Sequence, residues 1–167
     1  MIMSELFSYY DGELDEFIAD AMLNSGEFIK RVISDVSANL VEDLRQRNVI
    51  VDVTWKHTLD NSAVCHTIRI HGSDKEALRG QLPVTEADLL LIPDIVQNYD
   101  IIIIEKNRRG QDVIIYSKEM ADGVTYYVEE VRQGRRELAA STMYKRKKRK
   151  LTDANGPATQ ISDLFSF

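Results

Sequence analysis

The three histidines of this chain, His57, His66 and His71, lie within fifteen residues of one another. An imidazole has an unperturbed pKa of about 6.5, so it can give or take a proton near neutral pH. On one helix, His66 and His71 project about 140° apart, so they can share a pocket only if the helix ends close to them. Gly72, directly after His71, predicts such an end. The competing interpretation is structural, with each ring satisfied by hydrogen bonds on the surface or in the core.

A strand-like run at residues 135–144 offers two hydroxyl groups as further polar partners. Because side chains alternate along a regular strand, one set of residues would share a face: Arg136, Leu138, Ala140, Thr142 and Tyr144. The hydroxyls of Thr142 and Tyr144 could bind a phosphate or hold a histidine in place. The alternative is an amphipathic strand in which both residues only pack.

Basic side chains that could bind phosphate are spread along the second half of the chain. The candidates are Arg79, Lys118, Arg132, Arg136 and Lys145. Residues 145–150 form a run of six consecutive cations, which is typical either of a solvated tail or of a phosphate-binding arm. The net charge of −6 argues against strong non-specific affinity for nucleic acid.

Metal and disulfide sites are not predicted. Cys65 is the single cysteine, so neither a disulfide framework nor a thiolate-rich zinc site can form within one chain. No HExxH pattern is present, and no third or fourth ligand stands at a suitable spacing from the histidines. We therefore expect no metal and no cofactor.

Length and hydropathy indicate one globular domain. The chain has 167 residues, of which 44% are hydrophobic and 29% are charged. No run approaches the roughly 18–20 apolar residues that cross a bilayer, and the first residues lack the pattern of a secretory leader. We expect a cytoplasmic protein that does not associate with a membrane.

The first part of the chain is predicted to be mainly helical. Two helical patterns run from Leu6 to Met22 and from Phe28 to Leu44, and a strand follows at Val49–Trp55. Residues 60–62 offer N-caps for a helix that reaches Ile70 and stops at Gly72. Another helix starts at the capping-box-like Thr85–Asp88, bends or restarts at Pro93 and ends near Asn98.

The second part of the chain is predicted to be a β-meander. Four β-type runs are joined by short turns: Asp100–Lys106, Asp112–Lys118, Val124–Arg132 and Arg135–Tyr144. Short turns between successive strands favour antiparallel pairing. Helices followed by a four-stranded antiparallel meander give an α+β fold.

An ordered set of short motifs between about residues 50 and 147 resembles the phage barnase–EndoU–colicin–RelE-like nucleases. The motifs are His66–Gly72, Arg79–Gln81, Thr85–Asp88, Ile92–Asp94, Tyr127–Arg132, Gly134–Leu138 and Thr142–Lys145. The resemblance implies helices before a four-stranded antiparallel sheet, and RNase-like activity in a phage- or toxin-associated protein. It divides the chain into a helical lead-in (1–48), a nuclease domain (49–147) and a basic, flexible tail (148–167).

The leading hypothesis is a metal-independent endoribonuclease in which the 2′-hydroxyl of RNA attacks the adjacent phosphorus. His66 and His71 would supply the base, the acid or both, and Asp60 or His57 could orient the pocket. The expected partners are RNA (tRNA or another structured RNA) and an immunity, antitoxin or phage protein, in the bacterial cytoplasm or packaged in a virion. The alternatives are a catalytically inactive RNA-binding module and a phage structural or protein-interaction module on the same fold.

Overall fold

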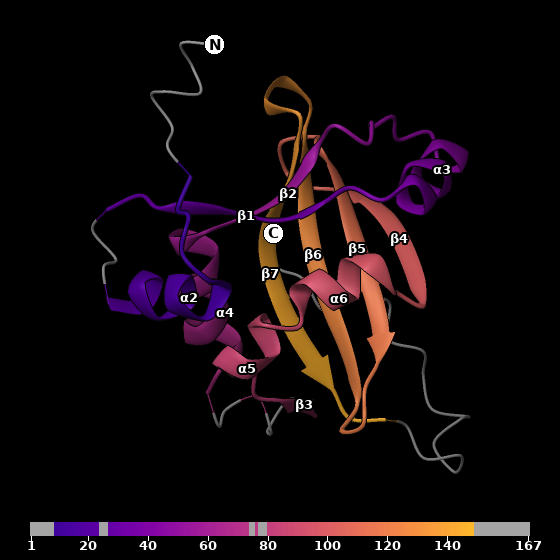
Figure 1. The fold of residues 1–167 in the computed structure, drawn as a ribbon. Helices are drawn as coiled ribbons and strands as arrows, with labels where there is room; N and C mark the ends of the chain where they lie inside the picture. Colours follow the sequence, from indigo (N-terminus) through magenta and orange to yellow (C-terminus); the bar gives the residue numbers. More distant parts are fainter. Residues whose placement is uncertain (1–8, 24–26, 74–75, 77–79, 149–167) are drawn as a thin grey trace.

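The computed structural model describes residues 9–23, 27–73, 76 and 80–148 (Figure 1). Its helices are α2 (Leu14–Leu23), α3 (Ala38–Gln46), α4 (Asn61–His71), α5 (Glu86–Leu89) and α6 (Ile92–Gln97). Its strands are β1 (Lys30–Asp35), β2 (Lys56–Asp60), β3 (Gln81–Leu82), β4 (Ile101–Lys106), β5 (Asp112–Glu119), β6 (Val124–Arg132) and β7 (Glu137–Arg146), and the 3₁₀ helix η2 (Gln133–Arg135) joins β6 to β7. The α+β prediction is confirmed.

The sheet is larger than the sequence suggested. Within the described residues it has seven strands in the order β1-β2-β7-β6-β5-β4, and β3 pairs with β7. β2 and β7 run parallel, whereas the other pairs are antiparallel. The four predicted runs become β4 to β7 within this sheet, so the prediction of a four-stranded, purely antiparallel sheet is wrong.

The N-terminal half departs most from the prediction. Residues 30–35 form β1, paired with β2, and the helix begins only after Ser37, whose side chain accepts the N–H of Leu40 at 3.1 Å. A short run of mixed apolar and polar residues fits both the helical and the strand periodicity. Pairing with β2 made this segment a strand. Strands from before and after residue 49 therefore belong to one sheet, although the nuclease domain was predicted to begin at that residue.

The strand predicted at Val49–Trp55 is also wrong. The Asp52 carboxylate accepts the N–H of Thr54 at 2.7 Å, and its carbonyl accepts the N–H of Trp55 at 3.0 Å. This Asp-centred turn takes up the backbone groups that a strand would need. Strand β2 starts at Lys56, one residue after the end of the predicted strand.

Helix boundaries set by local capping are confirmed. Asp60 caps α4 by accepting the N–H of Ala63 at 2.8 Å, and Gly72 follows its last residue. Thr85 and Asp88 form a reciprocal capping box at the start of α5. A separate helix, α6, restarts at Ile92 with its proline in the first turn and ends at Gln97, with Asn98 as its C-cap.

The sheet has two faces that differ in what covers them. The inner face, which carries Tyr116, Tyr127 and Leu138, packs in the main hydrophobic core together with residues from α3, α5 and α6 (Figure 1). The outer face carries a smaller buried apolar cluster of Val113, Ile115, Val128 and Tyr144. Polar side chains surround this smaller cluster on the outer face.

A β-bulge in β7 changes which residues reach the outer face. Ala140 pairs with Glu129 and Thr142 pairs with Val128, so Ser141 is an extra residue on this strand. Residues before the bulge, such as Ala140, face inward at even positions, whereas Thr142 and Tyr144 face outward. The prediction that residues 136–144 share one face at every second position is therefore wrong.

Candidate active site

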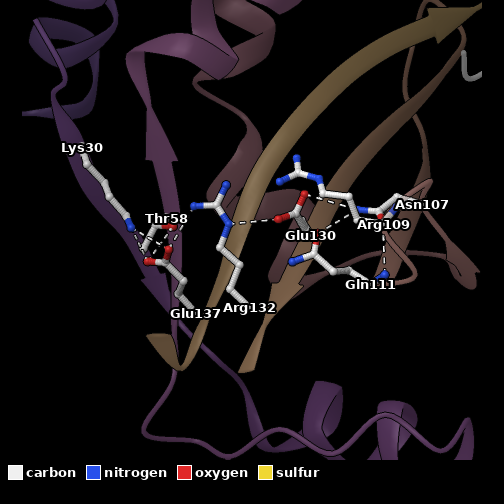
Figure 2. A network of polar contacts seen from close by, with 8 residues as sticks. All are labelled: Lys30, Thr58, Asn107, Arg109, Gln111, Glu130, Arg132 and Glu137. Atoms are coloured by element: carbon white, nitrogen blue, oxygen red, sulfur yellow. Dashed lines mark hydrogen bonds and ion pairs between the residues drawn. The ribbon is translucent and has the colours of Figure 1, made fainter. Parts of the chain in front are cut away.

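Glu137, the first residue of β7, is the centre of a buried polar cluster on the outer face (Figure 2). Lys30 donates a hydrogen bond to its carboxylate at 2.6 Å, and the Arg132 guanidinium donates another at 3.2 Å. The Thr58 hydroxyl approaches the second oxygen at 3.4 Å. Only 2% of the Glu137 side chain is exposed. We call Lys30, Thr58, Arg132 and Glu137 the Glu137 cluster.

Strand register explains why these residues meet. Arg132 stands directly opposite Glu137 in the β6–β7 pair, and Thr58 stands opposite Ala139 in the β2–β7 pair. Residues opposite one another in paired strands point to the same face. Lys30 comes from β1, 107 residues away in the chain from Glu137.

The Glu137 cluster continues across the sheet as a polar band. Arg132 also donates to Glu130 at 3.1 Å, and Glu130 accepts from the Asn107 side chain at 3.4 Å (Figure 2). The Asn107 oxygen accepts the backbone N–H groups of Arg109 and Gln111, each at 3.0 Å, which fixes the β4–β5 turn.

A pocket of about 270 Å³ opens at this end of the band. It is lined by Asn107, Arg108, Arg109, Val113, Glu130 and Ser141, and we call it the arginine pocket. Two exposed arginines line it beside one carboxylate, and guanidinium groups are the side chains that typically bind anionic ligands.

The charge of Arg132 is secured by its surroundings. Burial works to lower the pKa of Arg132, but hydrogen bonds and charges from Glu130 and Glu137 raise it above the ordinary value. Buried ion pairs of this kind contribute little to stability compared with well-packed apolar residues. Charged groups gathered beside a pocket are therefore a candidate for ligand binding or catalysis.

Tyr9 lies over the edge of the Glu137 cluster. The Lys30 ammonium is 6.0 Å from the centre of the Tyr9 ring, and the ring is about half exposed. Partial burial and the charge of Glu137 raise the pKa of the Tyr9 hydroxyl, while Arg135 acts in the opposite direction. Tyr9 thus keeps its proton at neutral pH and can donate a hydrogen bond.

His71 forms a second cluster on the outer face, further along β7. Its Nδ1 lies 3.3 Å from Glu76, and its ring centre lies 5.7 Å from that of Tyr144. Thr142 is buried next to Tyr144 on the same face, and its hydroxyl has no hydrogen-bond partner among the described residues. We call His71, Glu76, Thr142 and Tyr144 the His71 cluster. Burial raises the pKa of Tyr144 well above its ordinary value, so the phenol stays protonated.

The structure brings three of the four predicted catalytic residues together and leaves His66 apart. His71, Thr142 and Tyr144 belong to one buried group, whereas His66 lies on the exposed side of α4. Partial burial and the nearby charges of His71 and Arg69 lower the pKa of His66.

The remaining histidine, His57, faces the inner side of the sheet. Its Nδ1 is 2.8 Å from Glu129, which also accepts the hydroxyls of Tyr116 and Tyr127 at 2.5 and 3.1 Å. None of these side chains is more than 1% exposed. Asp60, the other predicted orienting residue, is used as the N-cap of α4.

The predicted phosphate-binding cations have different environments. Arg132 lies in the Glu137 cluster, and Arg136 is exposed in a left-handed turn (φ 54°) after η2. Lys118 donates to the carbonyl of Asn98 at 2.6 Å. Arg79 lies outside the described residues.

Lys145, the last of these cations, is already neutralised within the fold. Its ammonium contacts Asp122 at 2.5 Å and Asp88 at 3.1 Å, with 7% of the side chain exposed. The two carboxylates hold this lysine between the β5–β6 turn and α5, so its contacts are structural.

Sequence reasoning missed most of the polar band. The missed residues are Lys30, Thr58, Asn107, Arg109, Glu130 and Glu137. One signal was available: Glu130 and Arg132 are two apart in a strand pattern, so they share a face. No such signal existed for Lys30, because its segment was predicted to be helical.

The described residues contain no group of three or more histidine, cysteine or acidic side chains arranged to hold a metal ion. Within the same part of the chain, no helix is long and apolar enough to span a membrane.

Comparison with protein families assigns the chain to a nuclease family. The family model described as phage-Barnase-EndoU-ColicinE5/D-RelE like nuclease3 matches residues 36–153, which is more than half of the chain. The matched range includes the His71 cluster, the arginine pocket and both Arg132 and Glu137, but not Lys30 or Tyr9. No curated protein and no solved structure gives a significant match.

Proposed function

Because the chain belongs to the phage-Barnase-EndoU-ColicinE5/D-RelE like nuclease3 family, we propose that it cleaves RNA on the outer face of its sheet without a metal ion. The observation that carries this proposal is the polar band. Cations and carboxylates alternate along it, it opens at the arginine pocket, and it shares a face with the His71 cluster.

RNA carries its own nucleophile, which limits what the protein must supply. The 2′-oxygen attacks phosphorus and the bond to the 5′-oxygen breaks, leaving a 2′,3′-cyclic phosphate and a 5′-hydroxyl. A base must take the 2′-hydroxyl proton, and an acid must protonate the departing 5′-oxygen. Cations must stabilise the extra charge that develops on the phosphate.

The arginine pocket suits the scissile phosphate. Arg108 and Arg109 are exposed and line it. Arg132 contacts Glu130, and its raised pKa keeps the guanidinium charged. One planar guanidinium group can donate two parallel hydrogen bonds to a pair of phosphate oxygens. Glu130 lines the same pocket, so we assign it as the acceptor of the 2′-hydroxyl proton. Glu137 and Lys30 position Arg132 in this proposal.

His71 is assigned as the acid that serves the leaving group. Ser141 lines the arginine pocket, and Thr142, the next residue, belongs to the His71 cluster. The contact with Glu76 orients the imidazole, and imidazoles exchange protons near neutral pH. His66 has no role in this scheme.

The test is cleavage of end-labelled RNA in the presence of EDTA. We expect cyclic phosphate products, no cleavage of an all-DNA strand, and protection when the 2′-hydroxyl at the cut site is methylated. His71→Gln should lower kcat by about 10²-fold or more, whereas the matched control His66→Gln should stay within about twofold.

Three results would contradict the proposal. Products with 5′-phosphates, or loss of cleavage in EDTA, would exclude the 2′-hydroxyl mechanism without metal. Full activity of His71→Gln would remove the histidine from it. Salt-sensitive RNA binding without any cleavage would instead support the alternative of an inactive RNA-binding module.

A further inference from the structure

The outer face is hollowed a second time, at the end away from the Glu137 cluster. A shallow pocket of about 820 Å³ lies over the ends of β4, β5 and β6. Its wall follows one row of paired residues, in which Ile101 stands opposite Ser117 and Ser117 opposite Tyr126. The next residue in this row, Tyr144 of β7, belongs to the His71 cluster. The second pocket and the proposed acid thus lie on one line across the sheet.

Stacked rings connect the two places. The Tyr126 ring lies 5.0 Å from that of Tyr144 at an angle of 15°, and the Tyr144 ring lies 5.7 Å from that of His71. Tyr126 is half-buried and lines the pocket. Flat aromatic surfaces next to a pocket are typical of sites that hold unpaired bases of single-stranded RNA.

The described lining of this pocket carries an excess of negative charge, whereas that of the arginine pocket carries an excess of positive charge. Asp100, Glu119 and Lys148 line it, and the Glu119–Lys148 ion pair measures 2.9 Å. Among the described lining residues, Asp100 is therefore a carboxylate without a lysine partner, which disfavours a phosphate there. The Asp100 carboxylate is held in place because it accepts the backbone N–H of Glu119 at 2.7 Å.

We propose that this pocket is a base-recognition subsite that takes an unpaired nucleobase carrying an exocyclic amino group, on the same RNA strand as the scissile link but further along it. Tyr126 stacks on the base, and Asp100 accepts a hydrogen bond from the amino group. A carboxylate is a pure acceptor, so it favours cytosine over uracil, which has a carbonyl oxygen at the same ring position. This inference rests on the proposed RNA-cleaving function, because it assigns a subsite for the same substrate.

The test uses short 2′-O-methyl oligonucleotides, which bind without being cleaved. Two fluorescently labelled pentamers that differ by one cytosine or uracil at the central position are titrated with the full chain, and anisotropy gives each Kd. We expect the cytosine pentamer to bind about tenfold more tightly. A second pair, guanine against inosine, removes only the amino group and should show the same preference.

Variants identify the residues responsible. Asp100→Asn keeps an acceptor for the Glu119 amide but adds a donor, so the preference for cytosine should fall to about twofold or less. Tyr126→Leu should weaken both pentamers by a similar factor, because stacking does not depend on base identity. Asp112→Asn, at the other end of β5, is the matched control and should leave both affinities unchanged.

Equal affinities for the two pentamers in the wild-type protein would overturn the subsite, as would a preference that survives Asp100→Asn. Absence of binding to any of the oligonucleotides would also overturn it. The proposed function fails separately, when cleavable RNA of the preferred sequence is bound with the expected contrast but is not cut. Cleavage without base preference would refute only the subsite.

Discussion

Glu129 and Glu130 are adjacent in β6, yet they face opposite sides of the sheet and have different partners. Glu129 is sealed on the inner face, where it accepts hydrogen bonds from His57 and two tyrosine hydroxyls. Glu130 borders the arginine pocket on the outer face and contacts Arg132. Two carboxylates of the same type, one residue apart, thus differ in access to a ligand. A sealed, fully partnered carboxylate organises the core, whereas one at a pocket can act on a substrate.

The largest effect is expected from removing the sealed carboxylate. Glu129→Ala leaves the His57 ring and the hydroxyls of Tyr116 and Tyr127 buried without their acceptor, so it should lower the free energy of unfolding by about 3–5 kcal/mol. Urea denaturation measures this. Glu130→Ala, the matched control, should cost about 1 kcal/mol. Equal losses in the two variants would mean that the two faces do not differ in this way.

The reverse asymmetry is expected for cleavage. Glu130→Gln keeps the shape of the side chain but removes the proton acceptor, so kcat should fall by about 10²–10⁴-fold while the urea midpoint barely moves. Initial rates on end-labelled RNA check the first statement and urea denaturation checks the second. A kcat within a few-fold of the wild-type value would reassign the base to another residue.

A smaller effect is expected from one cation of the arginine pocket. Arg109→Gln should weaken RNA binding similarly for all sequences and make the plot of log K against log salt concentration shallower by about 0.7. Arg45→Gln is the control, because Arg45 is exposed on α3 and paired with Glu42. Binding to a non-cleavable strand at several salt concentrations gives both slopes. If the two variants have the same slope as the wild type, the phosphate does not bind at this pocket.

The smallest effect concerns the exposed histidine. Because the pKa of His66 is lowered in the folded state, the unfolded chain binds this proton more readily, and stability is lost as the pH falls through and below about 6.5. His66→Gln removes this contribution, so the drop in Tm from pH 7.5 to pH 5.5 should be slightly smaller than in the wild type. Thermal melts at the two pH values measure the change. A larger drop in the variant would reverse the sign of this linkage.

Features that depend on a few neighbouring residues could be predicted from the sequence. Asp60 and Gly72 bound α4, and Thr85 with Asp88 starts α5, because caps are local hydrogen bonds between residues three or four apart. The positions of the last four strands followed from alternating side chains and turn residues. The ordered motifs were sufficient to identify the nuclease family.

Features that depend on pairing between distant segments could not be predicted. The segment at residues 30–35 became a strand because β2 lay beside it, and β2 itself pairs in parallel with β7, the last strand. The bulge at Ser141 turned Thr142 and Tyr144 away from the core, which no local pattern indicated. The candidate site depends on both the pairing of β1, β2 and β7 and the bulge at Ser141.

The sequence alone therefore determined the class of fold, the helix ends and the family, because each rests on short-range geometry or on ordered motifs. The tertiary structure alone decided that Lys30 meets Glu137 and that Glu130, not Glu129, lines a pocket. The physical reason is that the face a strand residue occupies changes with every one-residue shift of register. That register is set by the packing of the whole sheet.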